Sequence, residues 1–197
     1  VMRDAVLAIE DARFYKHGGV DYVGVLRAGL ANFGEARSQG ASTITMQVAR
    51  NFYLPTEKTF TRKIYEMLLA LKIESLLNKN QILELYLNIA QFGPGVFGVR
   101  EGARYQFGKE LSRLSQDEIL NLVCLLPSPE RWNPKRSNPV YLSHRLRVLQ
   151  NYALYRGIRS RADSTAPEWI RRVYDSLSNV LVEQRWKKLR SNSGVPI

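Results

Sequence analysis

Residues 62–71 read Arg62-Lys63-Ile64-Tyr65-Glu66-Met67-Leu68-Leu69-Ala70-Leu71. Within this stretch the apolar residues Ile64, Met67, Leu68 and Leu71 recur at steps of three and four, the spacing of one face of an α-helix. The same spacing returns in residues 82–87, whereas the alternation typical of β-strands is nearly absent. The sequence therefore predicts a mainly α-helical fold.

Short signals mark where the predicted helices begin and end. Residues 78–81 and 115–118 each begin with Asn or Ser and end with Gln or Glu, the pattern of a capping box at a helix start. Pro127 and Gly157 are expected to stop helices, and four prolines in residues 127–139 predict a loop. No internal repeat interrupts the pattern, so we expect the helices to fold around one core.

Composition limits the class of protein. The 197 residues suit one compact domain. Its 29 basic and 18 acidic residues leave a net charge of +11, which indicates an anionic partner: a nucleic acid, a phospholipid surface or a phosphorylated substrate. The single cysteine, Cys124, excludes an internal disulfide and a multi-thiolate metal site, and its aliphatic neighbours predict a small buried hydrophobe.

The start of the chain bears on membrane attachment. The sequence has no run of 18 or more apolar residues and no leader before Val1. Because the chain opens directly on residues that run into its first polar motif, we expect a fragment from which a preceding membrane anchor has been removed.

Three polar runs, at residues 10–21, 39–51 and 62–66, are too dense to be ordinary helix surface. The first begins with Glu10 and the third ends with Glu66. Two separated carboxylates can serve as base and charge stabiliser in one cleft when their surroundings differ. From the residues alone, Glu10 can also be a solvated acid at a helix end, and Glu66 can form an ordinary surface pair with Arg62, worth about 0.3–0.5 kcal/mol.

These runs, in this order, resemble the peptidoglycan glycosyltransferase domain (glycosyltransferase family 51), which occurs alone as a monofunctional transglycosylase or within class A penicillin-binding proteins. The family motifs Glu-Asp-x-x-Phe-x-x-His-x-Gly, Gly-x-Ser-Thr-Ile-Thr-x-Gln and Arg-Lys-x-x-Glu are all present. A fourth run lies at residues 84–98 and a weaker fifth at 145–149. At two positions, Met46 and Gln91, the sequence departs from residues common in the family. The resemblance covers residues 1–157, and residues 158–197 are expected to form a C-terminal linker and an amphipathic helix of unknown role.

The resemblance implies a two-lobed, lysozyme-like helical domain. It implies an enzyme that polymerises lipid II into β-1,4 glycan strands, with inversion at the donor carbon and release of undecaprenyl pyrophosphate. The implied place is the outer face of the bacterial cytoplasmic membrane. The implied partners are lipid II, the growing glycan strand, the membrane surface and other cell-wall synthesis proteins, with no nucleic acid.

The resemblance also assigns roles to residues. Glu10 is the expected general base, and Glu66 is expected to assist at the leaving group, where a divalent cation, Mg²⁺ or Mn²⁺, would be held with the substrate pyrophosphate. No metal site made of protein ligands alone is expected, because a single carboxylate makes a weak one. The residues expected to bind substrate are Arg27, Ser42, Thr45, Gln47, Arg50, Asn51, Lys58, Arg62 and Lys63.

Two other functions stay open at this point. A glycan-cleaving enzyme on a lysozyme-like fold would also use carboxylates, but it has no pyrophosphate to bind, so the basic residues beside the motifs count against it. A nucleic-acid-binding module would account for the net charge of +11, but its cations should form a stripe interleaved with aromatic residues. Here the cations follow the carboxylate motifs instead.

Overall fold

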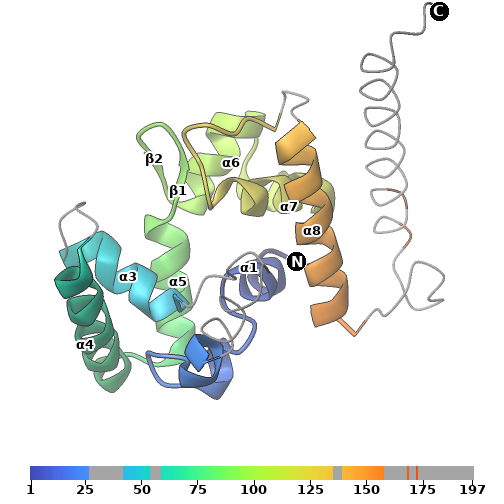
Figure 1. Cartoon of the computed structure of the whole chain (residues 1–197). Helices are drawn as coiled ribbons and strands as arrows, with labels where there is room; N and C mark the ends of the chain where they lie inside the picture. The colour runs from blue at the N-terminus through green and yellow to red at the C-terminus, as the bar shows by residue number, and fades with distance from the viewer. Residues whose placement is uncertain (27–41, 54–58, 135–138, 158–167, 169–171, 173–197) are drawn as a thin grey trace, which may run out of the picture.

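The computed structural model describes residues 1–26, 42–53, 59–134, 139–157, 168 and 172. In these residues helices prevail, and the only strands form a small hairpin (Figure 1). The elements in chain order are α1 (Met2–Glu10), η1 (Phe14–Lys16), α3 (Ile44–Tyr53), α4 (Phe60–Leu76), α5 (Lys79–Ile89), β1 (Gln91–Gly93), β2 (Val96–Phe97), α6 (Val99–Phe107), η2 (Leu111–Arg113), α7 (Gln116–Leu125) and α8 (Pro139–Tyr155).

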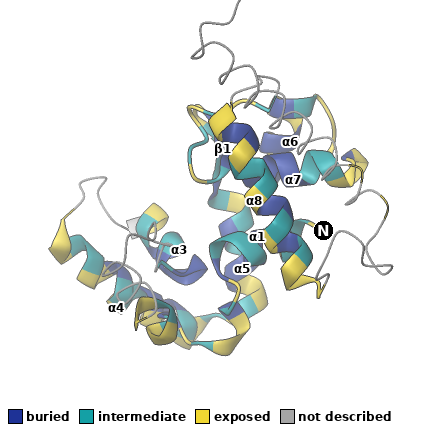
Figure 2. Cartoon of the chain, turned by 45° about the vertical axis from the view of Figure 1, so that its right-hand side comes forward, coloured by how far each residue is buried: buried dark blue, intermediate teal, exposed yellow. Residues whose placement is uncertain are grey.

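The helices form two lobes on either side of α5 (Figure 1). In one lobe α3 packs against α4 and against α5; in the other, α1 packs against α7 and α8, and α6 packs against α7. Most buried apolar residues belong to one cluster, to which α1, α3, α5, α7 and α8 all contribute (Figure 2). A smaller cluster of Val20, Met46 and Ala70 lies in the lobe of α3 and α4. The architecture confirms the mainly α-helical prediction and is consistent with the two-lobed, lysozyme-like form.

The predicted helix boundaries are confirmed. Asn78 accepts a hydrogen bond from the backbone of Gln81 and the Gln81 side chain accepts one from the backbone of Asn78; Ser115 and Glu118 repeat this reciprocal pattern at the start of α7. Helix α8 ends just before Gly157, whose φ of 79° lies in the left-handed region that favours glycine. Each signal acts within a few residues, so it could be seen in the sequence.

Cys124 is buried in the core, as predicted, and its burial raises the pKa of its thiol well above the ordinary range. The thiol is therefore a small hydrophobe of α7.

The hairpin β1–β2 is the small exception in a described fold in which strands are nearly absent, as predicted. Its two short strands pair in an antiparallel manner, with Gln91 opposite Phe97, around a turn that contains Gly95 at φ 70°. Strands of three and two residues are too short to show a clear alternation of apolar and polar residues.

Among the described residues, no helix combines the length and the apolar composition needed to cross a bilayer. The predicted linker and amphipathic helix of residues 158–197 lie outside the described residues, apart from positions 168 and 172.

Candidate active site

Glu10 is the last residue of α1, and its side chain points at α3. Gln47 Nε2 donates a hydrogen bond of 2.7 Å to Glu10 Oε2. Burial raises the pKa of the Glu10 carboxyl above its ordinary value, and the Gln47 hydrogen bond and the positive charge of Arg50 offset part of this rise. Glu10 is half-buried and hydrogen-bonded to Gln47, which does not fit the solvated helix-end acid of the alternative interpretation. A carboxylate whose pKa is raised is better suited to accept a proton near neutral pH.

Tyr86 of α5 lies close to this carboxyl. The residue is 2% exposed, and burial raises the pKa of its phenol well above its ordinary value, with the charge of Glu10 as a second cause. The buried ring supplies part of the low-dielectric surroundings that act on Glu10.

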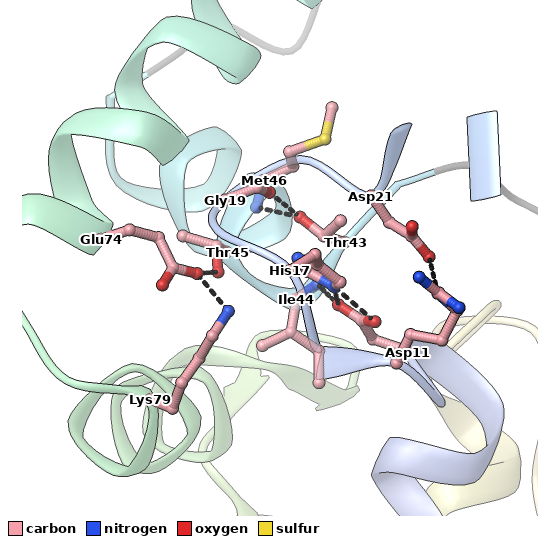
Figure 3. A network of polar contacts seen from close by, with 11 residues as sticks. Asp11, His17, Gly19, Asp21, Thr43, Ile44, Thr45, Met46, Glu74 and Lys79 are labelled. Atoms are coloured by element: carbon pink, nitrogen blue, oxygen red, sulfur yellow. Dashed lines mark hydrogen bonds and ion pairs between the residues drawn. The ribbon is translucent and has the colours of Figure 1, made fainter. Parts of the chain in front are cut away.

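Asp11, next to Glu10, joins the first polar run to the start of α3 (Figure 3). Its Oδ2 accepts a hydrogen bond of 3.1 Å from the backbone N–H of Ile44, the first residue of α3, and its Oδ1 lies 2.9 Å from His17 Nε2. Thr43 adds a second tie, because its hydroxyl donates to the Gly19 carbonyl at 2.5 Å. These contacts hold the segment after Glu10 against the beginning of α3.

Glu66 lies on α4 and its side chain is 1% exposed. Lys63 Nζ donates to its Oε2 at 2.9 Å, and Arg62 Nε lies 3.5 Å from its Oε1. Lys63 Nζ also donates to Ser42 Oγ at 2.9 Å. The predicted pair of Arg62 and Glu66 therefore exists, but it is buried and shared with Lys63, unlike an ordinary surface pair.

Residues 42–47 are linked to both acids. Gln47 contacts Glu10 directly, and Ser42 is joined to Glu66 through Lys63. Arg50, one turn after Gln47, is close enough for its charge to act on Glu10. The segment therefore has a carboxylate beside a neutral amide at one end and a carboxylate between two cations at the other.

The remaining predicted binding residues are placed unequally. Asn51 is exposed on α3, near Arg50 in the chain. Arg27 and Lys58 lie outside the described residues, so their predicted contacts with phosphates stay predictions.

The structure corrects the prediction for Thr45. Its side chain is fully buried, and its hydroxyl donates a hydrogen bond of 2.7 Å to Glu74 Oε1 instead of facing a substrate (Figure 3). Lys79 Nζ donates to the same oxygen at 2.6 Å. Glu74 and Lys79 had no recognisable signal in the sequence, because their partners lie on other elements.

The described part of the chain contains no group of three or more His, Cys, Asp or Glu residues that could hold a metal ion. Both carboxylate oxygens of Glu66 face cationic side chains. The residues around Glu66 therefore do not fit a divalent cation held by protein ligands.

Comparison with known proteins identifies the family. The family model described as Transglycosylase (Transgly) matches residues 1–153. A protein of Cupriavidus necator that is named "Putative transglycosylase" is 52% identical to this chain over 152 residues. These residues are 77% of this chain and 64% of that protein. The chain therefore belongs to the transglycosylase family.

Two further relatives are longer proteins. Penicillin-binding protein 1A of Neisseria cinerea is 46% identical over 155 residues, which are 78% of this chain and 19% of the relative. Penicillin-binding protein 1A of Escherichia coli strain K12 is 46% identical over 149 residues, which are 75% of this chain and 18% of the relative. The chain thus spans less than two thirds of each of these relatives.

Proposed function

We propose that this chain is a peptidoglycan glycosyltransferase that polymerises lipid II into β-1,4 glycan strands. The observation that carries the proposal is that Glu10 and Glu66 are both joined to segment 42–47, Glu10 through Gln47 and Glu66 through Lys63 and Ser42. The pKa of the first carboxyl is raised, and the second carboxylate lies between two cations. Membership of the transglycosylase family supports it independently.

In this reaction Glu10 accepts the proton of a sugar hydroxyl as that oxygen attacks the anomeric carbon of the donor. The new bond joins that oxygen to the anomeric carbon, and the bond from this carbon to the pyrophosphate oxygen breaks. Attack opposite the leaving group inverts the donor carbon. Undecaprenyl pyrophosphate departs with the bonding electrons, and the proton stays on Glu10 until solvent removes it.

The leaving pyrophosphate gathers negative charge, which preorganised cations can stabilise. Glu66 holds Lys63 and Arg62 by ion pairs, so these cations are already ordered before substrate binds. We assign Glu66 this electrostatic role at the leaving group, with Ser42, Gln47, Arg50 and Asn51 on the donor side. A divalent cation, Mg²⁺ or Mn²⁺, would have to be carried mainly by the pyrophosphate oxygens and water.

The proposed place of action is the outer face of the bacterial cytoplasmic membrane, where lipid II and the growing strand are held at the lipid surface. On α4 the side chains of Phe60, Ile64, Tyr65 and Leu68 are all exposed. Large apolar side chains next to Arg62 and Lys63 suit a lipid interface with anionic headgroups. Residues 1–157 are the proposed catalytic domain.

A direct test is to incubate the chain with lipid II and to separate the products by length. Glycan strands longer than a dimer, together with free undecaprenyl pyrophosphate, are the expected result, and a phosphoglycolipid inhibitor of the moenomycin type should suppress both. The glycan-cleaving alternative predicts the opposite: preformed strands become shorter and lipid II stays unused.

A further inference from the structure

Glu74 and Lys79 form an ion pair where α4 is followed by α5. Lys79 Nζ lies 2.6 Å from Glu74 Oε1, and the two side chains are only 20% and 14% exposed. Glu74 belongs to the last turn of α4, the helix of Glu66, and Lys79 is the first residue of α5, the helix of Tyr86. The pair therefore joins two helices that both contribute to the candidate active site.

On one side this pair contacts α3. Thr45 Oγ1 donates to the same Glu74 oxygen at 2.7 Å (Figure 3), and two residues later Gln47 donates to Glu10. Because each helical residue turns by about 100°, Thr45 and Gln47 point to nearly opposite sides of α3. Helix α3 is thus held by Glu74 on one side and by Glu10 on the other.

On its other side the pair contacts η1, which begins four residues after Glu10. Lys79 Nζ lies 4.4 Å from the centre of the Phe14 ring, which is 1% exposed. The hydroxyl of the next residue, Tyr15, donates to Asn80 Oδ1 at 2.9 Å. The first two residues of α5 therefore hold two successive aromatic residues of η1, the first through a cation–π contact.

We propose that Glu74 and Lys79 are positioning residues, which hold α3 through Thr45 and η1 through Phe14 and thereby set Glu10 against Gln47 for turnover. Neither side chain contacts Glu10 in the structure, so both act through other residues. The inference rests on the proposed function of Glu10 as the base.

Physical magnitudes favour a geometric role over a role in stability. The loss of hydration offsets much of the attraction within a buried ion pair, so such a pair adds little net stability. Catalysis, in contrast, can fall about 100-fold when a reacting group is displaced by about 1 Å. Because the Glu74–Lys79 pair bridges α3, α4, α5 and η1, its loss can displace Glu10 relative to Gln47.

The test compares Lys79→Met, Lys79→Arg and Glu74→Gln with a control from another ion pair. The control is Lys109→Met, because Lys109 Nζ lies 2.7 Å from Glu118 Oε1 on elements far along the chain from Glu10. With lipid II as substrate, we expect Lys79→Met to lower kcat about 10- to 100-fold while KM stays within about twofold. Lys79→Arg, which keeps the charge over Phe14, should restore most of kcat, and Lys109→Met should leave it unchanged.

Two results of this kinetic comparison would overturn the inference. One is a kcat in folded Lys79→Met no lower than that in Lys109→Met. The other is a failure of Lys79→Arg to recover activity although its fold is intact. If Lys79→Met does not fold, the kcat of Glu74→Gln is compared with that of Lys109→Met instead. The amide oxygen of Gln still accepts from Thr45, but the negative charge that pairs with Lys79 is gone.

A second measurement does not depend on activity. The Glu10 carboxyl is titrated by ¹³C NMR in the wild type, Lys79→Met and Lys109→Met. Looser contacts let water reach Glu10, so its raised pKa should fall toward the ordinary 4.5 in Lys79→Met alone. A wild type that leaves lipid II unused contradicts the proposed function only; an unchanged Glu10 pKa in Lys79→Met overturns the positioning role.

Discussion

At the residue scale, Glu10 and Glu66 have the same side chain but different partners. Glu10 receives a neutral amide hydrogen bond and has a pKa raised by burial, whereas Glu66 lies between Lys63 and Arg62. A proton acceptor benefits from the first setting, and the ordering of cations around a developing anion requires the second. The environment, rather than residue type, therefore separates the two proposed roles.

Replacing Glu10 by Gln keeps the size of the side chain but removes its ability to accept a proton. We expect polymerisation of lipid II to fall by about 10²- to 10⁴-fold. Circular dichroism should show an unchanged helical fold, because a Gln carbonyl can still accept from Gln47. Turnover equal to that of the wild type would show that Glu10 is not the base.

The same variant makes a prediction about stability. Since the folded-state pKa of Glu10 is raised above 4.5, the native state holds this proton more tightly than the unfolded chain does. Ionisation of Glu10 therefore lowers the free energy of unfolding as the pH rises from 4.5 through the folded-state pKa. Urea unfolding of the wild type and Glu10→Gln, at pH 4.5 and at about pH 7.5, should show the variant gaining stability relative to the wild type at the higher pH. A constant difference would contradict the raised pKa.

For Glu66, the substitution Glu66→Gln removes the charge that orders Lys63 and Arg62. We expect turnover to fall more than binding of lipid II, because the ordered cations matter most when the pyrophosphate leaves. Glu118→Gln, which removes a carboxylate paired with Lys109, is the control and should change neither quantity. Equal losses of binding and turnover in Glu66→Gln would favour a role in substrate binding alone.

At the scale of elements, what the sequence could predict depended on the range of the contacts. The capping boxes of α5 and α7 and the apolar faces of the helices arise within a few residues, so their patterns were visible. Glu10 and Glu66 were found through motif resemblance, since spacing alone left both alternatives open. The contact of Thr45 with Glu74 joins α3 to α4, and no local pattern could show that its hydroxyl is used inside the protein.

Two capping residues provide a matched comparison of elements. Asn78→Ala and Ser115→Ala each remove the side-chain acceptor of a capping box, so each should lower the free energy of unfolding by about 1 kcal/mol. Only Asn78 precedes Lys79 and Asn80, the residues that hold η1. We therefore expect Asn78→Ala alone to lower kcat, measured at a temperature where both variants are folded. Equal kcat values would show that the start of α5 is not coupled to turnover.

At the scale of the whole molecule, the net charge of +11 does not by itself specify a partner. What matters is where the cations lie. Arg62 and Lys63 are paired with Glu66, and Arg50 acts on Glu10, so positive charge is concentrated beside both proposed catalytic acids. A pyrophosphate at this position would meet ordered cations as well as the general field of the protein.

The variants Arg50→Ala and Arg113→Ala separate the effect of cations at the site from the effect of the protein's overall charge. Each variant removes one positive charge. Arg113 is exposed in η2, which packs on α6, whereas Arg50 lies close to Glu10. Long-range fields fade over a Debye length of about 8 Å at physiological salt, so loss of Arg113 should have little effect on a ligand at the site. Loss of a contact with a charged group costs about 1.5–3 kcal/mol, so Arg50→Ala should weaken binding of a phosphoglycolipid of the moenomycin type about tenfold or more. Both affinities are measured by calorimetry at one ionic strength; equal losses would mean that the anion is attracted by net charge and not by the cations of the site.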